Sequence, residues 1–170
     1  MLQVGDRETD RYHELVIKVL TSACLLGEPV RPKARDVRSH HPVLAGWIAE
    51  GRIVSACPEV LGGLGVPRPP AEIDPATGRV FTNGGEDVTE AFERGARIVG
   101  ALCADQGIRV AILKANSPSC GSRIIYDGTF SGAKIAGDGV TAALLRKNGV
   151  AIFDENQLDE AARYVASLES

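Results

Sequence analysis

Three of the four cysteines, Cys24, Cys57 and Cys120, stand at equivalent places in the sequence. Each follows a short run rich in Val, Ile or Leu and lies in a loop that contains Gly or Pro. If these runs are parallel strands, their carboxyl ends lie along one edge of one sheet, which is where open α/β sheets bind ligands. The sequence therefore predicts that three thiols, far apart in the chain, meet at one site.

Thiolates brought together from distant loops suit an iron–sulfur cluster or another soft metal. Structural zinc sites usually use closely spaced pairs of ligands, and the sequence contains no Cys-x-x-Cys. The spacing alone is equally compatible with thiols that are small buried apolar side chains. Cys103 falls on the apolar stripe of a predicted helix, so we expect it in the core. The remaining three thiolates would leave one iron of a [4Fe–4S] cluster with an open coordination position.

Polar residues accompany two of these cysteines. Glu59 follows Cys57 by two residues and could act as a general acid or base in the same cleft, or could cap a helix or form a salt bridge. Asn116, Ser117 and Ser119 precede the third cysteine. Their side chains could bind a substrate or cluster sulfurs, or could satisfy backbone groups of the turn.

Other candidates have weaker signals. Tyr126 and Phe130 could stack on a flat heterocycle, although isolated aromatic residues more often belong to the core. His40 and His41 lie in a polar segment, where metal ligation is disfavoured. The basic stretch 31–38 favours a solvated loop over a patch that binds phosphate or RNA.

The apolar pattern predicts the elements that position these residues. Strands are expected at 15–22, 52–56, 109–114 and 150–153, and helices at 41–50, from Asp87 to 107, from Gly139 to 149 and at 158–168. Asp87 and Glu90 have the spacing of a capping box, and a short β-ribbon is possible at 79–82. In the third helix Val140, Ala143 and Leu144 are expected to face inward. The alternation of strands and helices predicts a Rossmann-like α/β fold, an open parallel sheet with helices on both faces.

Length and composition limit the class of protein. With 170 residues, the chain is expected to form a single α/β domain over 15–170 that follows a polar, flexible leader at 1–14. A net charge of −3 gives no indication of a DNA partner. The sequence has no membrane-length apolar stretch and no signal peptide, which favours the cytoplasm, where thiols stay reduced.

Six ordered motifs resemble those of one bacterial family. They are Ser22-Ala23-Cys24-Leu25-Leu26-Gly27, Cys57-Pro58-Glu59 followed by Gly62-Gly63-Leu64, Pro67-Arg68-Pro69-Pro70-Ala71-Glu72, Lys114-Ala115-Asn116-Ser117-Pro118-Ser119-Cys120-Gly121, Tyr126-Asp127-Gly128-Thr129-Phe130-Ser131-Gly132 and Gly137-Asp138-Gly139-Val140-Thr141-Ala142-Ala143-Leu144-Leu145. The family, long labelled as a domain of unknown function, includes the 2-thiouracil desulfidases. The resemblance covers the chain from about Val16 to Phe153.

The resemblance implies an oxygen-sensitive [4Fe–4S] cluster held by Cys24, Cys57 and Cys120. It also implies that Glu59 is the catalytic carboxylate and Ser117 the catalytic serine. The implied reaction is the hydrolytic removal of sulfur from a small thiolated nucleobase such as 2-thiouracil, with release of hydrogen sulfide. Many relatives read Val-Arg-Tyr-Asp-Gly after the first cysteine loop. This chain has a more basic segment there, so a thiolated nucleoside, nucleotide or other thioamide remains an alternative substrate.

Two other functions are compatible with some of these residues. A non-catalytic protein that stores or delivers a cluster or sulfur would need the cysteines but not Glu59 or Ser117. A metal-free cysteine hydrolase is disfavoured because the three histidines, His13, His40 and His41, lie in no motif suited to a Cys–His pair.

Overall fold

The computed structural model describes residues 16–31 and 36–170. Its centre is a parallel sheet of β1 (Val19–Ser22), β2 (Ile53–Ala56), β5 (Val110–Ile112) and β8 (Ala151–Phe153) in the order β2-β1-β5-β8. All four predicted strands are present, although each is shorter than expected, the first and third most of all. From β1 the chain moves to β2 on one side, and it then crosses back to β5 on the other side of β1. The boundary between β1 and β5 is therefore the topological switch point, where doubly wound sheets bind ligands.

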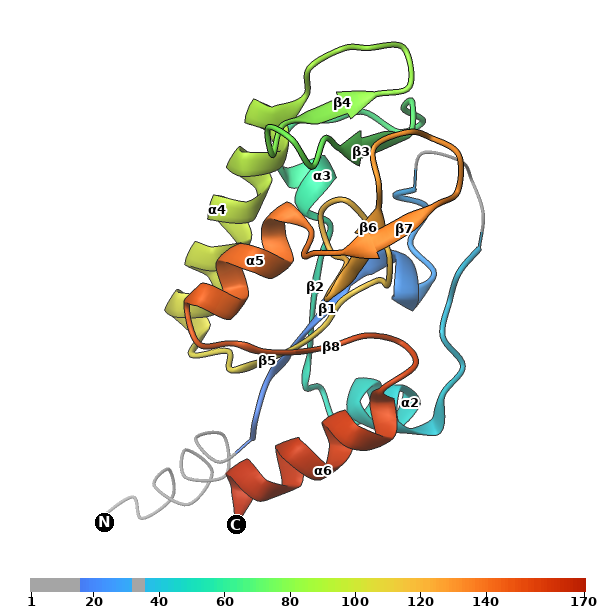
Figure 1. The fold of residues 1–170 in the computed structure, drawn as a ribbon. Coiled ribbons are helices and arrows are strands. Elements are labelled where there is room, and N and C mark those ends of the chain that lie inside the picture. Colours follow the sequence, from blue (N-terminus) through green and yellow to red (C-terminus); the bar gives the residue numbers. More distant parts are fainter. Residues whose placement is uncertain (1–15, 32–35) are drawn as a thin grey trace, which may run out of the picture.

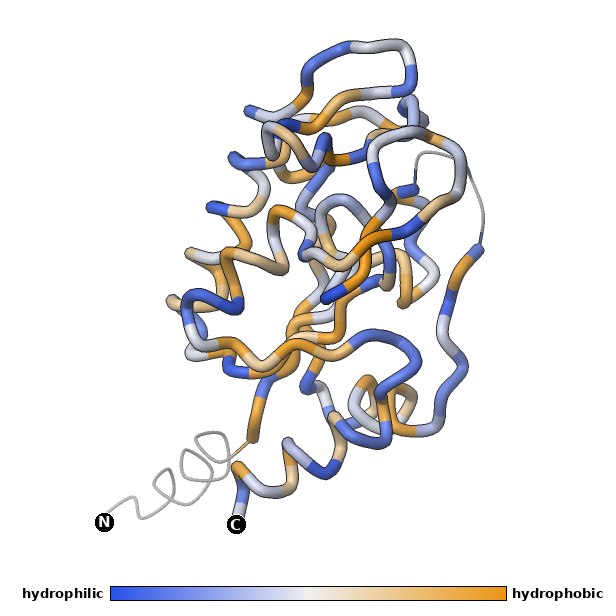
Figure 2. Tube along the Cα trace, in the orientation of Figure 1, coloured by the Kyte–Doolittle hydropathy of each residue, from blue (hydrophilic) through white to orange (hydrophobic). Residues whose placement is uncertain are grey.

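Helices cover both faces of the sheet, as predicted (Figure 1). On one face α4 (Thr89–Gln106) and α5 (Val140–Lys147) pack against Leu20, Ala111 and Ile152. On the other face α2 (Pro42–Ala49) and α6 (Leu158–Glu169) pack against Val19 and Ile112. Figure 2 shows the resulting pattern, with apolar strands in the middle of the molecule and polar residues on its outer turns. Each fully buried aliphatic side chain in these layers stabilises the fold by about 1.5–3 kcal/mol.

Short elements gather beyond the carboxyl edge of the sheet. The 3-10 helix η1 (Ala23–Leu26) follows β1, and the single-turn helix α3 (Pro58–Leu61) follows β2. Two antiparallel hairpins lie further out, one of β3 (Ala71–Ile73) with β4 (Val80–Thr82) and one of β6 (Ile124–Tyr126) with β7 (Lys134–Ala136). The first hairpin contains the predicted ribbon. Its partner strand and the second hairpin were not anticipated from the sequence.

Two local predictions were wrong in part. The carboxylate of Asp87 does accept a hydrogen bond from the backbone N–H of Thr89 at 3.0 Å, but Glu90 pairs with Arg94 at 3.2 Å and takes no part in a capping box. Val140 of α5 packs against a buried cluster, as expected. Ala143 is exposed, however, and the buried residues of the helix are Thr141, Ala142 and Leu145. The helix is turned because the backbone N–H groups of its first turn donate to carbonyls of the loop that carries Cys120, including Val140 N to Pro118 O at 2.9 Å.

Backbone-to-backbone packing holds α3 against α4. A Cβ atom on Gly95 would overlap the carbonyl oxygen of Pro58, and one on Gly62 would overlap the carbonyl oxygen of Ala91. Glycine at both positions therefore lets the two helices approach more closely than any side chain would permit. The contact fixes the position of Glu59, which lies on α3.

Some predictions concern residues outside the described ranges. The predicted leader, 1–14, lies there, and so do Lys33 and Arg35 of the basic stretch. None of the helices in the described ranges combines the length and apolar character that a membrane span requires.

We expect Gly95→Ala to lower the free energy of unfolding by about 1–3 kcal/mol, because the new methyl group forces α3 and α4 apart. The matched control is Gly46→Ala in the interior of α2, where nothing lies within 4 Å of the added Cβ. That variant should gain about 0.5–1 kcal/mol, because alanine favours the helix over the unfolded chain. Urea denaturation measures both, and equal effects of the two substitutions would contradict the packing argument.

Candidate active site

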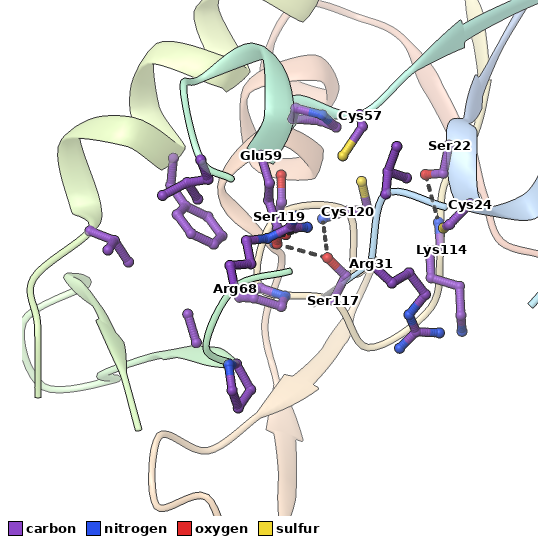
Figure 3. A pocket seen from close by; sticks show the side chains of 18 of the residues that line it. Ser22, Cys24, Arg31, Cys57, Glu59, Arg68, Lys114, Ser117, Ser119 and Cys120 are labelled. Carbon is purple, nitrogen blue, oxygen red and sulfur yellow. Dashed lines mark hydrogen bonds and ion pairs between the residues drawn. The ribbon is translucent and has the colours of Figure 1, made fainter. Parts of the chain in front are cut away.

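A pocket of about 310 Å³ opens at the carboxyl edge of the sheet (Figure 3). Its walls contain all three predicted ligand cysteines, together with Glu59 and Ser117. A volume of this size suits a small molecule or a compact cofactor. The structure therefore confirms the prediction that these residues, which are distant in the sequence, lie around one site.

The three thiols lie close enough to influence one another. Burial raises the pKa of Cys24 to about 11, while Arg31 and Lys114 lower it and Cys57 raises it further. Burial also raises the pKa of Cys57, against hydrogen bonds from backbone N–H groups at the start of α3. Cys120 has a pKa raised to about 12 by burial. In the chain without a metal, these side chains are neutral thiols near pH 7.

The loop of Cys120 is held between two elements. Ser22 at the end of β1 accepts a hydrogen bond from the backbone N–H of Lys114 at 3.0 Å, and its hydroxyl lowers the pKa of the Cys120 thiol against the effect of burial. From the other side, Gly139 packs so closely on the backbone of Ser119 that a Cβ there would overlap it. These contacts fix the loop of Cys120 to both the sheet and α5.

Glu59 forms a buried ion pair with Arg68 in the pocket wall (Figure 3). Arg68 Nε donates to Glu59 Oε2 at 2.8 Å, and Nη2 donates to the same oxygen. The side chains of Arg68 and Glu59 are only 8% and 11% exposed. The salt bridge that we considered as an alternative for Glu59 thus exists, and it lies inside the site.

The serines before Cys120 differ in their environment. Ser117 Oγ accepts hydrogen bonds from the backbone N–H groups of Ser119 at 3.1 Å and Cys120 at 3.0 Å, as the dashed lines in Figure 3 show. Its own hydrogen is therefore available to another acceptor. The buried hydroxyl of Ser119 instead bonds to Thr141 Oγ1 at 2.9 Å and joins the loop to α5. Asn116 lines the pocket with a left-handed backbone, φ 66°.

Several other candidates do not reach the pocket. Cys103 is buried in the core cluster between α4 and the sheet, as predicted. Phe130 is exposed and absent from the pocket wall, whereas Tyr126 lines it. The imidazole of His41 caps α2 by accepting from Val43 N at 3.2 Å. His40 does not line the pocket.

Sequence reasoning missed three residues of the site. Arg68, Lys114 and Ser22 line the pocket and belong to the family motifs, but the sequence indicates no role for them. Each of the three lies in a motif that contains a predicted site residue or stands next to one. This proximity in the sequence is the signal that could have indicated their place in the site. Lys114 pairs with Glu155, whose other oxygen accepts from the backbone N–H of Ala115 at 2.8 Å.

The donor set fits a cluster better than a single ion. Over residues 16–31 and 36–170, no three His, Cys, Asp or Glu side chains converge in the way that one metal ion requires. A [4Fe–4S] cluster bonds each thiolate to a different iron, so its ligands surround a cavity. Three sulfur donors on three loops around one pocket have that arrangement.

A sequence model of the 2-thiouracil desulfurase family matches residues 19–157. The chain belongs to the 2-thiouracil desulfurase family. The matched range includes the whole sheet, the three pocket cysteines, Glu59 and Ser117.

Two relatives of this desulfurase-family chain are informative. The chain is 44% identical to the uncharacterized protein YbbK of Bacillus subtilis (strain 168) over 150 residues, which cover 84% of this chain and 98% of YbbK. Its fold is similar to a solved structure of the [4Fe–4S]-dependent thiouracil desulfidase TudS, with a TM-score of 0.85 and 48% identity. That match covers 89% of this chain and 99% of TudS.

The raised thiol pKa values predict that the pocket cysteines are alkylated slowly when the protein is reduced and free of metal. Because burial raises the pKa of Cys24 to about 11 and that of Cys120 to about 12, little thiolate forms at pH 8 and both should react far more slowly with iodoacetamide than a free thiol. Cys57, which is only half-buried, should react first. Rates should rise about tenfold per pH unit. Peptide mapping by mass spectrometry gives the order, with urea-unfolded protein as the control, and early labelling of Cys120 would contradict it.

Proposed function

We propose that this chain is a [4Fe–4S]-dependent desulfidase that removes sulfur hydrolytically from a small thiolated pyrimidine such as 2-thiouracil. The observation that carries the proposal is that one pocket holds three thiols, a buried carboxylate and a serine hydroxyl with a free hydrogen. Membership of the desulfurase family and the likeness to TudS support it.

Cys24, Cys57 and Cys120 would hold the cluster as thiolates, each losing its proton on binding. With three protein ligands, the bound cluster would supply a soft Lewis-acid iron with a free position for the substrate's sulfur. The pocket wall beside the cysteines also contains Tyr126 and Phe92, so a flat heterocycle has apolar surface to contact.

Glu59 would move the protons of the reaction. In hydrolysis a C–O bond to water forms at the thiocarbonyl carbon and the C–S bond breaks, so a thione and water give a carbonyl compound and hydrogen sulfide. One water proton is taken by the carboxylate as the oxygen attacks, and it is returned as sulfur leaves. No electron is gained or lost overall.

Ser117 would orient the substrate or the attacking water. Because its oxygen already accepts two backbone N–H groups, the hydroxyl is fixed in position and can donate its hydrogen into the pocket. A donor that is held before the substrate arrives stabilises developing negative charge without having to reorganise.

The cluster is tested by anaerobic reconstitution with iron and sulfide. We expect the wild type to bind about four irons per chain and to show the visible absorption of a [4Fe–4S] cluster, and we expect Cys24→Ala, Cys57→Ala and Cys120→Ala to lose it. Cys103→Ala is the matched control and should load normally, because Cys103 lies in the core. Normal loading of the three ligand variants would disprove the proposed ligands.

Catalysis is tested with Glu59→Gln, which keeps the size of the side chain and removes the base. It should retain iron and reduce the rate of sulfide release from 2-thiouracil by about 10²–10⁴-fold. Sulfide is measured anaerobically with the reconstituted protein, and a panel of thiolated bases, nucleosides and nucleotides compares substrates. If a fully loaded wild type releases no sulfide from any of them, a cluster or sulfur carrier becomes the better explanation.

A further inference from the structure

Arg68 contacts Glu59 in an unsymmetrical way. Both of its donating nitrogens, Nε and Nη2, bind the same carboxylate oxygen, Oε2. No donor in the described part of the chain reaches Oε1. Within those residues the only fully buried side-chain oxygen or nitrogen without a partner is Thr21 Oγ1. Oε1 of Glu59 has no partner there either, so it must keep some exposed surface, on a residue that lines the pocket.

The guanidinium is itself held in place. Arg68 Nη1 donates to the carbonyl oxygen of Gly65 at 3.1 Å, so all three nitrogens of the group are engaged. Because the guanidinium is planar, fixing three nitrogens fixes the direction from which it meets the carboxylate. The segment from α3 to β3 therefore contains both the carboxylate of Glu59 and the arginine that holds it in place.

This arrangement divides the two oxygens of Glu59 between different tasks. Oε2 is committed to Arg68, whereas Oε1 has no donor in the described part of the chain and is free to exchange a proton. A carboxylate on a flexible side chain would otherwise rotate and present either oxygen in many directions. The same contact places a positive charge beside Glu59, at the end of the pocket where the thiols gather.

Building on the proposed desulfidase activity, we propose that Arg68 is a positioning residue that holds Oε2 of Glu59 and thereby makes Oε1 the oxygen that exchanges protons with water and substrate. It acts through Glu59 and has no contact of its own with the reacting atoms. Loss of Arg68 should therefore lower kcat and leave both the KM for substrate and the cluster nearly unchanged.

The test uses the anaerobically reconstituted full chain with 2-thiouracil. Arg68→Ala should bind as much iron as the wild type, keep its KM within about twofold and lose roughly tenfold to a hundredfold in kcat. Guanidinium chloride at millimolar concentration should restore part of the lost kcat, because the free ion can occupy the space beside Oε2. Sodium chloride at the same concentration should restore none of it.

Arg94→Ala is the matched control. Arg94 donates to the carbonyl oxygen of Gly62 at 2.6 Å and so supports the same segment, but it makes no contact with Glu59. This variant should show no rescue by guanidinium. A similar loss of kcat and a similar absence of rescue in both variants would mean that Arg68 is only structural, which would overturn the proposal.

Arg68→Lys covers the case in which Arg68→Ala fails to fold. Lysine keeps the charge but offers one nitrogen on a flexible stem, so kcat should fall with iron content and KM retained. An unchanged kcat in Arg68→Lys, or a rise in KM alone, would overturn the proposal, the second because it assigns Arg68 to substrate binding. If the loaded wild type itself releases no sulfide, the proposed function fails, whatever Arg68 does.

Discussion

The parallel pairing of β1 with β2 on one side and β5 on the other is the constraint on which the site depends. Its register aligns Thr21 with Ser55 and Ile112, so the three strands end at about the same level. Each chain segment must turn away at that edge, and its first residues line the same pocket. A shift of one residue in any pair would move a cysteine loop by about 3.3 Å and turn its side chains to the opposite face.

Backbone contacts then keep the loops in place beyond the sheet. Gly62 and Gly95 let α3 lie directly on α4, and Gly139 brings the start of α5 against the loop of Cys120. The first N–H groups of α5, which have no partner within the helix, are satisfied by carbonyls of that loop. Because these contacts join main chains, they hold the loops without relying on flexible side chains.

The strand register and the backbone contacts beyond the sheet explain which features the sequence could predict. The apolar runs and the glycines after them indicate strands and turns locally, so the sheet and the three cysteines at its edge were found correctly. The inward face of α5 was predicted only in part. Val140 packs inward, but docking on the Cys120 loop also turns Thr141 and Ala142 inward, against the local apolar pattern. Arg68 was not assigned a role for a similar reason, since its contact with Glu59 arises from the path of an irregular segment that carries no periodic signal.

The thiols and the carboxylate share an environment that is shielded from water, and this shielding has a different consequence for each. Burial keeps Cys24 and Cys120 protonated in the metal-free chain, and the same shielding from water strengthens every charge interaction once thiolates form. Water that reacts in such a pocket needs a proton acceptor close at hand. Glu59 is the carboxylate buried beside the thiols, and Arg68 occupies one of its two oxygens. Proton transfer in the proposed reaction is thereby restricted to a single oxygen, which gives the reaction a defined direction of attack.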